Sequence, residues 1–249
     1  MLAAERREYL LDTLRRDGKI VAKTVAIEVG LSEDSVRRDL RELAAEGLVQ
    51  RVYGGALPVS PALADYAGRR SVSPDSKGRV ASLACTLIRP GSTVLLDGGT
   101  TALAVAHALP PELRCTIVTH SPTVAVALVE HPSVEVVILG GRLFKHSAVA
   151  GGAAVVEAAS RVTADMFLLG VTGIHPDAGL TTGDPDEAAV KRALAARAAE
   201  TWVLGSAEKI GAASPHQVLP LSEVAGVLTD APESATLDQI RQSTVVTSA

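Results

Sequence analysis

The spacing of apolar residues in the first 57 positions predicts three helices and a short β-wing. Apolar side chains recur at helical spacing within residues 5–16, around residues 25–29, and along the stretch that follows Ser32. A glycine follows each of these segments, at Gly18, Gly30 and Gly47, as is common where a helix ends. Residues 48–55 then alternate and reach a Gly-Gly pair, which is the pattern of a strand that turns.

From residue 77 onward, short β-branched runs alternate with alanine-rich helical stretches. The expected buried strands are residues 93–96, 116–118, 134–139, 166–171 and 201–204, with less regular strands near 218–219, 224–228 and 245–246. The expected helices are residues 77–88, 101–108, 123–130 and 186–199. This alternation predicts a doubly wound, mostly parallel α/β sheet, in which ligands bind at the carboxyl ends of the strands.

Charge divides the chain at the same place. Residues 1–56 hold 10 Lys+Arg and 10 Asp+Glu, whereas the other 193 residues hold 14 and 18, which accounts for the whole net charge of -4. A dense, mixed-sign block before an Ala/Val/Leu/Gly-rich block indicates two domains. We expect a winged helix-turn-helix domain at residues 1–57, a partly helical linker at 58–74 that contains Arg69 and Arg70, and an α/β domain at 75–249.

Composition narrows the classes of protein further. With 47% hydrophobic residues the chain can bury a core, and with 2% aromatics it lacks a base-stacking platform for single-stranded nucleic acid. No run of 18 apolar residues could span a membrane, and the charged N-terminus does not read as a signal peptide. Two cysteines and unpaired histidines give no metal framework. We therefore expect a soluble, cytoplasmic protein without a metal or cofactor.

The third predicted helix carries the first candidate chemistry. Ser32 is placed as its N-cap, and its arginines lie off the apolar stripe of Val36, Leu40 and Leu43. A helix that follows a Gly turn and precedes a wing is the helix-turn-helix pattern, and arginine suits both guanine edges and phosphates. The candidate DNA-binding residues are Ser32, Ser35, Arg37, Arg38, Arg41, Arg51 and Tyr53. The alternative is that Arg37 and Arg41 pair with Glu33 and Asp34 on a solvated helix.

The loop after the first α/β strand is the second candidate. Asp97-Gly98-Gly99-Thr100-Thr101 leads into a helix, so two glycines, two hydroxyls and the free N–H groups of a helix start could cradle a phosphate. An ordinary strand–helix turn has the same composition. Small and polar residues also end each of the other predicted strands, as a shared crevice requires.

These residues together resemble a known family. The run from Gly30 to Leu40, with its Arg-Arg-Asp-Leu element, and the later Gly54-Gly55-Ala56 resemble the winged helix-turn-helix of DeoR-family bacterial transcription regulators. The family usually has Thr-Ile where Ser35 and Val36 stand, which keeps a hydroxyl and a β-branched residue. It often has His at the position of Tyr53.

Residues 77–230 resemble the effector domain of the same family, which is similar to ribose-phosphate isomerases. The resemblance implies that Gly99, Thr100 and Thr101 hold the phosphate of a sugar phosphate, that Asp97 orients the loop, and that Glu187 and Lys209 meet sugar or phosphate oxygens. The candidate effector-binding residues are thus Asp97, Gly98, Gly99, Thr100, Thr101, His120, Glu187 and Lys209. Two departures are His120, where the family usually has Asn, and Glu208, where it usually has Ser. By themselves, Lys209 could be a solvated loop residue and Glu187 a first-turn helix carboxylate.

Three functions remain open from the sequence. The first is a transcription regulator, expected to be a repressor of a carbohydrate-metabolism operon, that binds double-stranded operator DNA as a homodimer or homotetramer and responds to a phosphorylated sugar. The second is a phosphosugar isomerase with an accessory N-terminal domain. The third is a protein-interaction module that uses the winged domain without DNA. The first accounts for both blocks of the chain.

Overall fold

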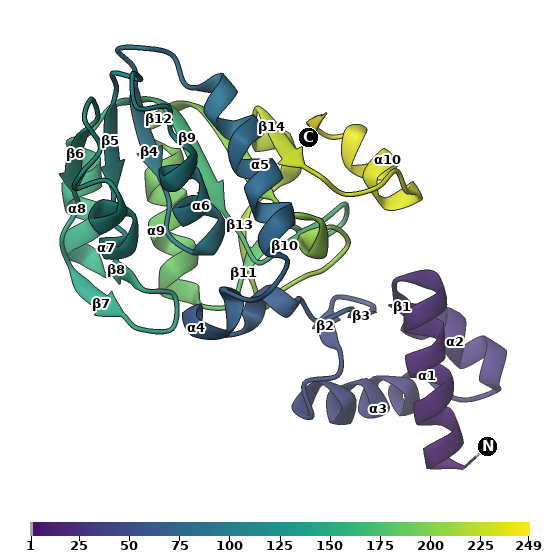
Figure 1. Cartoon of the computed structure of the whole chain (residues 1–249). Coiled ribbons are helices and arrows are strands. Elements are labelled where there is room, and N and C mark those ends of the chain that lie inside the picture. Colours follow the sequence, from purple (N-terminus) through teal and green to yellow (C-terminus); the bar gives the residue numbers. More distant parts are fainter. Residues whose placement is uncertain (1) are drawn as a thin grey trace.

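The larger domain is built on a seven-stranded parallel sheet. The computed structural model describes residues 2–249, and its sheet has the strand order β15-β14-β12-β9-β4-β5-β6 with every neighbouring pair parallel. The strands are β4 (Thr93–Leu96), β5 (Thr116–Thr119), β6 (Glu135–Ile138), β9 (Ala164–Gly170), β12 (Ala198–Gly205), β14 (Gly226–Thr229) and β15 (Val245–Ser248). The chain runs outward from β4 to β6 and then returns to β9 on the other side of β4, so the strand order reverses between β4 and β9 (Figure 1).

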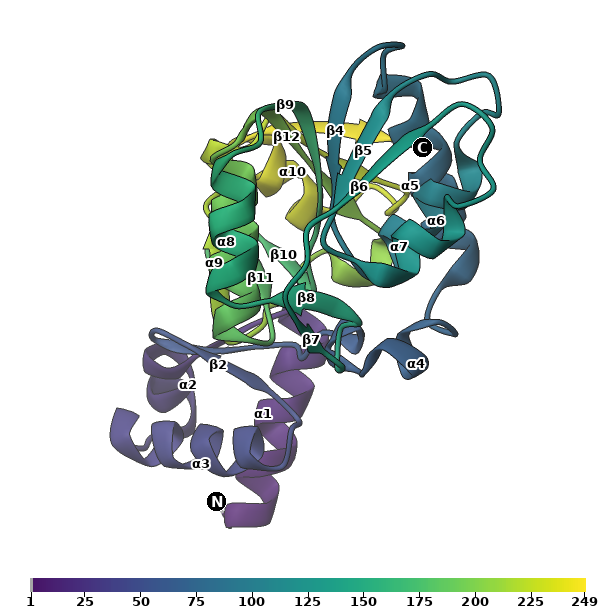
Figure 2. The same ribbon diagram turned by 90° about the vertical axis from the view of Figure 1, so that its left-hand side faces the viewer.

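Helices cover both faces of this sheet, as the doubly wound prediction requires. Helices α5 (Pro74–Leu87), α6 (Thr100–Ala108) and α7 (Pro122–Ala127) cover one face, and α8 (Ala153–Ser160), α9 (Pro185–Ala195) and α10 (Ala235–Arg241) cover the other (Figure 2). Successive strand residues alternate between the two cores: Phe167 packs with α8 and α9, and Leu168 packs with α5 and α6. The predicted α/β fold class is confirmed.

Several elements differ from the prediction. The helix expected over residues 186–199 ends at Ala195, because the alanine-rich run already enters β12 at Ala198. The sequence did not predict α8, α10 or most of the short antiparallel strands, although the strand expected near 218–219 is part of β13 (His216–Leu219). These strands are β7 (Arg142–Phe144) with β8 (Val149–Gly151), and β10 (Gly173–His175) and β11 (Gly179–Thr182) with β13 (His216–Leu219). Three- and four-residue strands carry too few positions to show a period of two, and distant pairing defines them.

The N-terminal domain has its own core and lies beside the α/β domain (Figure 1). Its elements are α1 (Ala3–Asp17), β1 (Ile20–Val21), α2 (Ala22–Val29), α3 (Glu33–Ala45), β2 (Gln50–Val52) and β3 (Gly55–Leu57). The wing is a three-stranded antiparallel sheet, in which β3 lies between β1 and β2. The predicted three helices and wing are therefore present, with one additional strand, β1.

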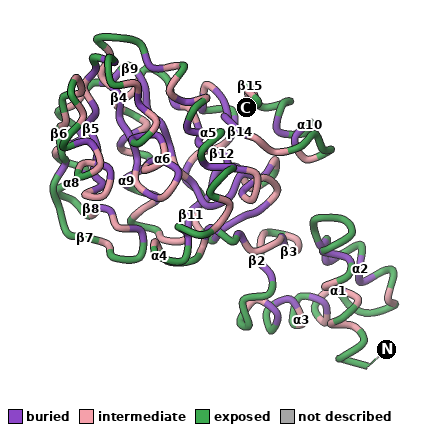
Figure 3. Tube along the Cα trace, in the orientation of Figure 1, coloured by how far each residue is buried: buried purple, intermediate pink, exposed green. Residues whose placement is uncertain are grey.

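The segment at 58–74, expected as a linker, packs onto the α/β domain. It contains a 3-10 turn, η1 (Pro61–Leu63), and a short helix, α4 (Tyr66–Arg69). The Ser60 hydroxyl donates to the carbonyl oxygen of Thr172, and the Tyr66 N–H donates to the carbonyl oxygen of His146 at 2.7 Å. Buried positions consequently continue from the wing into this segment (Figure 3).

Two classes of feature are missing from residues 2–249. None of the helices described there is long and apolar enough to cross a membrane. Nor does that part of the chain bring together three His, Cys, Asp or Glu side chains in a way that could hold a metal ion.

A methyl group at Gly55 should disrupt the wing. A Cβ atom at this position would lie 1.7 Å from the carbonyl oxygen of Ile20, inside the β1–β3 pairing. We expect Gly55→Ala to destabilise the winged domain by about 1–3 kcal/mol. The measurement is hydrogen exchange at the amides of β1 and β3, which should become faster. Unfolding of the α/β domain, followed by fluorescence of Trp202, the only tryptophan, should not change.

The control is Gly78→Ala. Gly78 is exposed within α5, and an added Cβ would meet nothing within 4 Å. Alanine is the better helix former, so this change should be neutral or slightly stabilising. Exchange rates in β1 and β3 that are the same in Gly55→Ala, Gly78→Ala and wild type would show that the wing tolerates the methyl.

Candidate anion site and DNA-facing helix

The loop that follows β4 lies where the strand order reverses. Asp97 is the first residue after β4, and Gly99 is the N-cap of α6 with φ +97°, a backbone conformation that favours glycine. A Cβ on Gly98 would lie 2.1 Å from Val149 Cγ1, so only glycine fits between the loop and β8. The first N–H groups of α6, those of Thr100 and Thr101, have no acceptor among the described residues. The loop therefore presents free donors at the carboxyl edge of the sheet.

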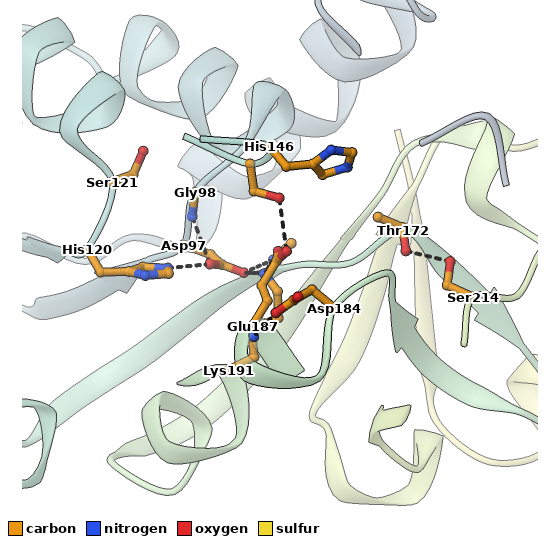
Figure 4. A network of polar contacts seen from close by, with 12 residues as sticks. Asp97, Gly98, His120, Ser121, His146, Thr172, Asp184, Glu187, Lys191 and Ser214 are labelled. Carbon is orange, nitrogen blue, oxygen red and sulfur yellow. Dashed lines mark hydrogen bonds and ion pairs between the residues drawn. The ribbon is translucent and has the colours of Figure 1, made fainter. Parts of the chain in front are cut away.

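Asp97 is completely buried and fixes this loop (Figure 4). Its carboxylate accepts from the N–H of Gly98 at 2.7 Å and from the N–H of Gly170, at the end of β9, at 2.8 Å. It also lies 2.5 Å from Lys191 Nζ on α9. Burial by itself would raise the pKa of Asp97, but the charge of Lys191 and the hydrogen bond from His120 outweigh it and hold that pKa below its ordinary value.

His120 forms a hydrogen bond with the buried carboxylate of Asp97. Its Nε2 lies 2.8 Å from Asp97 Oδ1, and its Nδ1 lies 2.7 Å from the carbonyl oxygen of Ala150. Both neighbours are acceptors, so a neutral ring can donate to only one of them. His120 does not line the cavity next to the Gly98–Thr101 loop and instead borders a larger cavity beside the β7–β8 hairpin. His120 thus holds Asp97 in place, and its contact with an effector stays a prediction.

Glu187 lines the cavity next to this loop. The N-cap residue Asp184 accepts the Glu187 N–H at 2.9 Å and so fixes the first turn of α9. The Glu187 carboxylate lies 3.2 Å from Lys191 Nζ and accepts from the Ser147 hydroxyl at 2.9 Å (Figure 4). Glu187 is thus more than a first-turn helix carboxylate, because it lines three adjoining cavities.

Lys209 is buried and faces the same loop. It ends a 3-10 turn, η2 (Ala207–Lys209), and its ammonium donates to Thr101 Oγ1 at 3.1 Å and to the carbonyl oxygen of Leu204 at 2.9 Å. Burial lowers the pKa of Lys209 to about 8, since the charge of Glu208 opposes this effect only in part and the neighbouring cations add to it. No carboxylate lies within ion-pair distance of Lys209 in residues 2–249. A solvated surface lysine would show none of these features.

The structure adds cationic residues that the sequence interpretation missed. Arg69 on α4 and Lys77 on α5 line the same cavity, and neither forms an ion pair with any described carboxylate. The Lys77 ammonium instead donates to the carbonyl oxygens of Arg69, at 2.6 Å, and Val72. The sequence places Arg69 in a predicted linker. No local pattern distinguishes a linker arginine from a cavity-lining one, because the distinction depends on how the segment folds back.

The helix-turn-helix places its arginines toward solvent. Ser32 Oγ accepts the Ser35 N–H at 3.3 Å, and the predicted stripe of Val36, Leu40 and Leu43 is buried, so the opposite side of α3 is free. Arg37 pairs with Glu33 at 2.6 Å, as the solvated-helix alternative expected.

The remaining candidates of this domain are exposed. Arg38 and Arg41 on α3 have no ion-pair partner within the described residues, so the pairing expected for Arg41 is not formed. Arg51 on β2 and Tyr53 at the tip of the wing are also exposed, and Tyr53 contacts little protein. The exposed arginines and Tyr53 are therefore accessible to a binding partner such as DNA.

Two family models match the two parts of the chain. Residues 6–62 match the DeoR-like helix-turn-helix domain, and residues 72–231 match the DeoR C terminal sensor domain. The HTH-type transcriptional repressor GlcR of Bacillus subtilis is 32% identical over 232 residues, which cover 92% of this chain and 89% of that protein. The glycerol-3-phosphate regulon repressor of Escherichia coli K12 is 30% identical and covers 96% of both chains. A putative aga operon transcriptional repressor of Escherichia coli O157:H7 is 30% identical, covering 91% of this chain and 86% of the other.

Removing the Asp97 charge should destabilise the α/β domain. In Asp97→Asn, Lys191 loses its closest counter-ion in a buried position, so we expect the free energy of unfolding to fall by about 3–5 kcal/mol. Denaturant unfolding followed by Trp202 fluorescence measures this change. Asp177→Asn, an exposed turn residue, is the control and should stay within about 0.5 kcal/mol of wild type.

The difference between wild type and Asp97→Asn should depend on pH. Because the folded-state pKa of Asp97 is lowered, its stabilisation is complete above the unfolded carboxyl pKa of about 4 and is lost as the pH falls below it. A difference in stability that stays constant down to the acid-unfolding region would contradict the assigned pairing.

Proposed function

Because the chain belongs to the DeoR family of transcription regulators, we propose that it represses a carbohydrate-metabolism operon and that a phosphorylated sugar controls its binding to operator DNA. Its winged domain would bind DNA through α3 and the wing. Its α/β domain would hold the effector in the cavity next to the Gly98–Thr101 loop. A ligand that prefers one arrangement of the two domains shifts the population that is able to bind the operator.

One observation carries the effector site: several cations around the start of α6 have no ion-pair partner. Lys209, Lys77 and Arg69 line one cavity, and none of them has a carboxylate partner at ion-pair distance in the described chain. The free N–H groups of Thr100 and Thr101 point to the same region of the fold. Buried cations without counter-ions are costly, and a phosphate group supplies both the missing charge and the missing acceptors.

The carboxylates that line the cavity can accept hydrogen bonds from the hydroxyl groups of a sugar phosphate. Glu187 and Glu208 also line it, and the Glu208 carboxylate accepts only from the Ser206 hydroxyl, at 2.7 Å. Carboxylates repel a phosphate but accept hydrogen bonds from hydroxyl groups. A ligand with an anionic end near Lys209 and a hydroxylated end near Glu187 satisfies both kinds of side chain. This distribution supports a phosphorylated sugar over inorganic phosphate or an unphosphorylated sugar.

The other two functions have less support. The curated relatives are named repressors, so the expectation that the chain is not an enzyme is confirmed. Asp97 is tied to Lys191, and Glu187 to Lys191 and Ser147, so the isomerase alternative would rest on Glu208 as the group that moves protons. A winged domain that binds only protein would not need unpaired arginines such as Arg38 and Arg41 on α3. The homodimer or homotetramer and the location in the cytoplasm stay predictions.

Loss of the α3 arginines should abolish operator binding. We expect Arg37→Ala with Arg38→Ala to weaken binding to the DNA upstream of the protein's own gene by about 100-fold or more, because each base or phosphate contact contributes about 1–3 kcal/mol. Fluorescence anisotropy at several salt concentrations measures the affinity and the number of ionic contacts.

The matched control removes the same charge from α1. Arg15 and Arg16 are adjacent, exposed and paired with acidic neighbours. Arg15→Ala with Arg16→Ala should bind nearly as wild type. If the two double variants lose affinity equally, binding depends on net charge and the assignment of α3 is wrong.

Effector affinity should fall at alkaline pH. Sugar phosphates are dianionic above pH 7, since their second pKa is about 6. Bound phosphate favours the charged form of Lys209, whose pKa burial lowers to about 8, so affinity should be steady near pH 7 and decrease by up to about tenfold per unit above pH 8. Calorimetry with sn-glycerol 3-phosphate, fructose 1-phosphate, glucose 6-phosphate and ribose 5-phosphate, here called the phosphosugar panel, tests this from pH 6.5 to 9.5.

Lys209→Met is the companion variant, since methionine keeps the length of the side chain without the charge. It should bind the phosphosugar panel weakly and lose most of the pH dependence. If no member of the panel binds the wild type, or if Lys209→Met binds as tightly as wild type at pH 7, the proposed effector site is wrong.

A further inference from the structure

Unsatisfied polar atoms gather around the candidate effector site. Four buried side-chain nitrogen or oxygen atoms have no hydrogen-bond partner within the described residues. Arg69 Nε and Glu208 Oε2 belong to residues that line the cavity next to the Gly98–Thr101 loop, and Thr182 Oγ1 belongs to the adjoining cavity. The fourth, His131 Nε2, borders neither. Buried polar atoms are nearly always hydrogen-bonded in folded proteins. These three atoms therefore indicate where a bound molecule could supply the hydrogen-bond partners that the chain does not.

Arg69 Nε is the one atom of the three that can only donate, because a threonine hydroxyl can donate or accept and a carboxylate oxygen accepts. The Arg69 side chain is only 9% exposed, and its single polar contact is a long one, from Nη2 to the carbonyl oxygen of His146 at 3.5 Å. Burial lowers the pKa of Arg69, although the charges of Glu187 and Asp97 oppose that effect from a distance. An arginine needs acceptors on several nitrogens, and in residues 2–249 this one lacks an acceptor on Nε. An oxygen atom of a bound ligand could accept the hydrogen bond that Arg69 Nε does not form within the described chain.

The position of Arg69 in the chain connects the cavity to the wing. Strand β3 of the wing ends at Leu57, and Ser60 is already bonded to the carbonyl oxygen of Thr172 in the α/β domain. Ala62, Arg69 and Val72 then line the cavity, so the segment that leaves the wing forms one of its walls. Thr172 lines the cavity as well, and its own hydroxyl contacts Ser214 at 2.6 Å (Figure 4). A molecule bound there touches both the sheet and the segment attached to the wing.

We propose that Arg69 contacts the bound phosphorylated sugar directly through Nε and that this contact couples occupancy of the cavity to the DNA-binding domain. This inference rests on the proposed function. Nε donates to a phosphate or sugar oxygen, while Thr182 Oγ1 and Glu208 Oε2 accept from sugar hydroxyls. The ligand class is therefore a phosphate ester that carries at least one free hydroxyl. Because the segment at 58–72 already packs on the α/β domain, a ligand that contacts Arg69 acts on the connection to the wing and so changes the position of the wing relative to the operator.

The experiment compares two arginines of the same segment in the full chain. Arg69→Ala and Arg69→Lys remove Nε, and the lysine variant keeps the positive charge. Arg70→Ala is the control, because Arg70 directly follows Arg69 but is exposed. Calorimetry with inorganic phosphate and with the phosphosugar panel measures affinity. Anisotropy with the upstream DNA measures operator binding without ligand and with saturating ligand.

The operator affinity of each variant without ligand is the reference against which its own response to ligand is measured. The affinity of the Arg69 variants for the panel member that binds wild type should fall by about tenfold or more, the effect of losing a charge-assisted hydrogen bond. At saturating ligand, operator occupancy should change less than in wild type, whereas Arg70→Ala should respond fully. A loss confined to sugar phosphates supports a contact with the sugar, and an equal loss with inorganic phosphate supports a contact with the phosphate group.

Two outcomes separate this inference from the function on which it rests. If wild type binds a panel member and Lys209→Met weakens that binding, but both Arg69 variants behave as Arg70→Ala does, the coupling role of Arg69 is overturned and the effector site stands. If wild type binds no panel member, the proposed function is overturned and this inference with it. Should Arg69→Ala fail to fold, as judged by its thermal unfolding, Arg69→Lys decides, because it keeps the charge and most of the side-chain volume.

Discussion

The candidate site depends on one buried ion pair, between Asp97 and Lys191. Asp97 has no exposed surface, and its carboxylate joins the ends of β4 and β9 to helix α9. His120, which directly follows β5, also bonds this carboxylate. A buried charge is stable only when it is paired and hydrogen-bonded, and Asp97 meets both conditions. The pair lies at the reversal of strand order, where an open α/β sheet forms its ligand crevice. The shape of the Gly98–Thr101 loop follows from it.

The same pair determines the charge that the cavity presents. Lys191 is bound by Asp97 and by Glu187, so these two carboxylates are not available to the other cations. Lys209 and Lys77 consequently donate only to a hydroxyl and to carbonyl oxygens. Because Lys191 pairs with both carboxylates, Lys209 and Lys77 have no ion-pair partner among the described residues, and a bound anion could supply one. The charge on which the proposed phosphate binding rests thus comes from the core of the domain as well as from the loop itself.

Sequence reasoning found the elements that have local signatures and missed those that depend on distant contacts. The apolar stripe of α3 and the strand–loop–helix at Asp97 could be read directly, because period and glycine placement specify them. The resemblance to DeoR regulators added Glu187 and Lys209, and the structure brings both to the same cavity. The sequence could not show that His120 bonds Asp97 and does not line this cavity. Nor could it show that Arg69 folds back into the site, since a proline-containing segment reads as a linker until its partner surface is known.

The central claim is that the cavity next to the Gly98–Thr101 loop binds a phosphorylated sugar in the full chain. An experimental structure of the protein with the phosphosugar that binds most tightly tests this most directly. The account predicts that the phosphate group lies within hydrogen-bond distance of the Thr100 and Thr101 N–H groups and of Lys209 Nζ, with the sugar hydroxyls near Glu187. A phosphate bound elsewhere, with Lys209 still bonded only to Thr101 and Leu204, would contradict it.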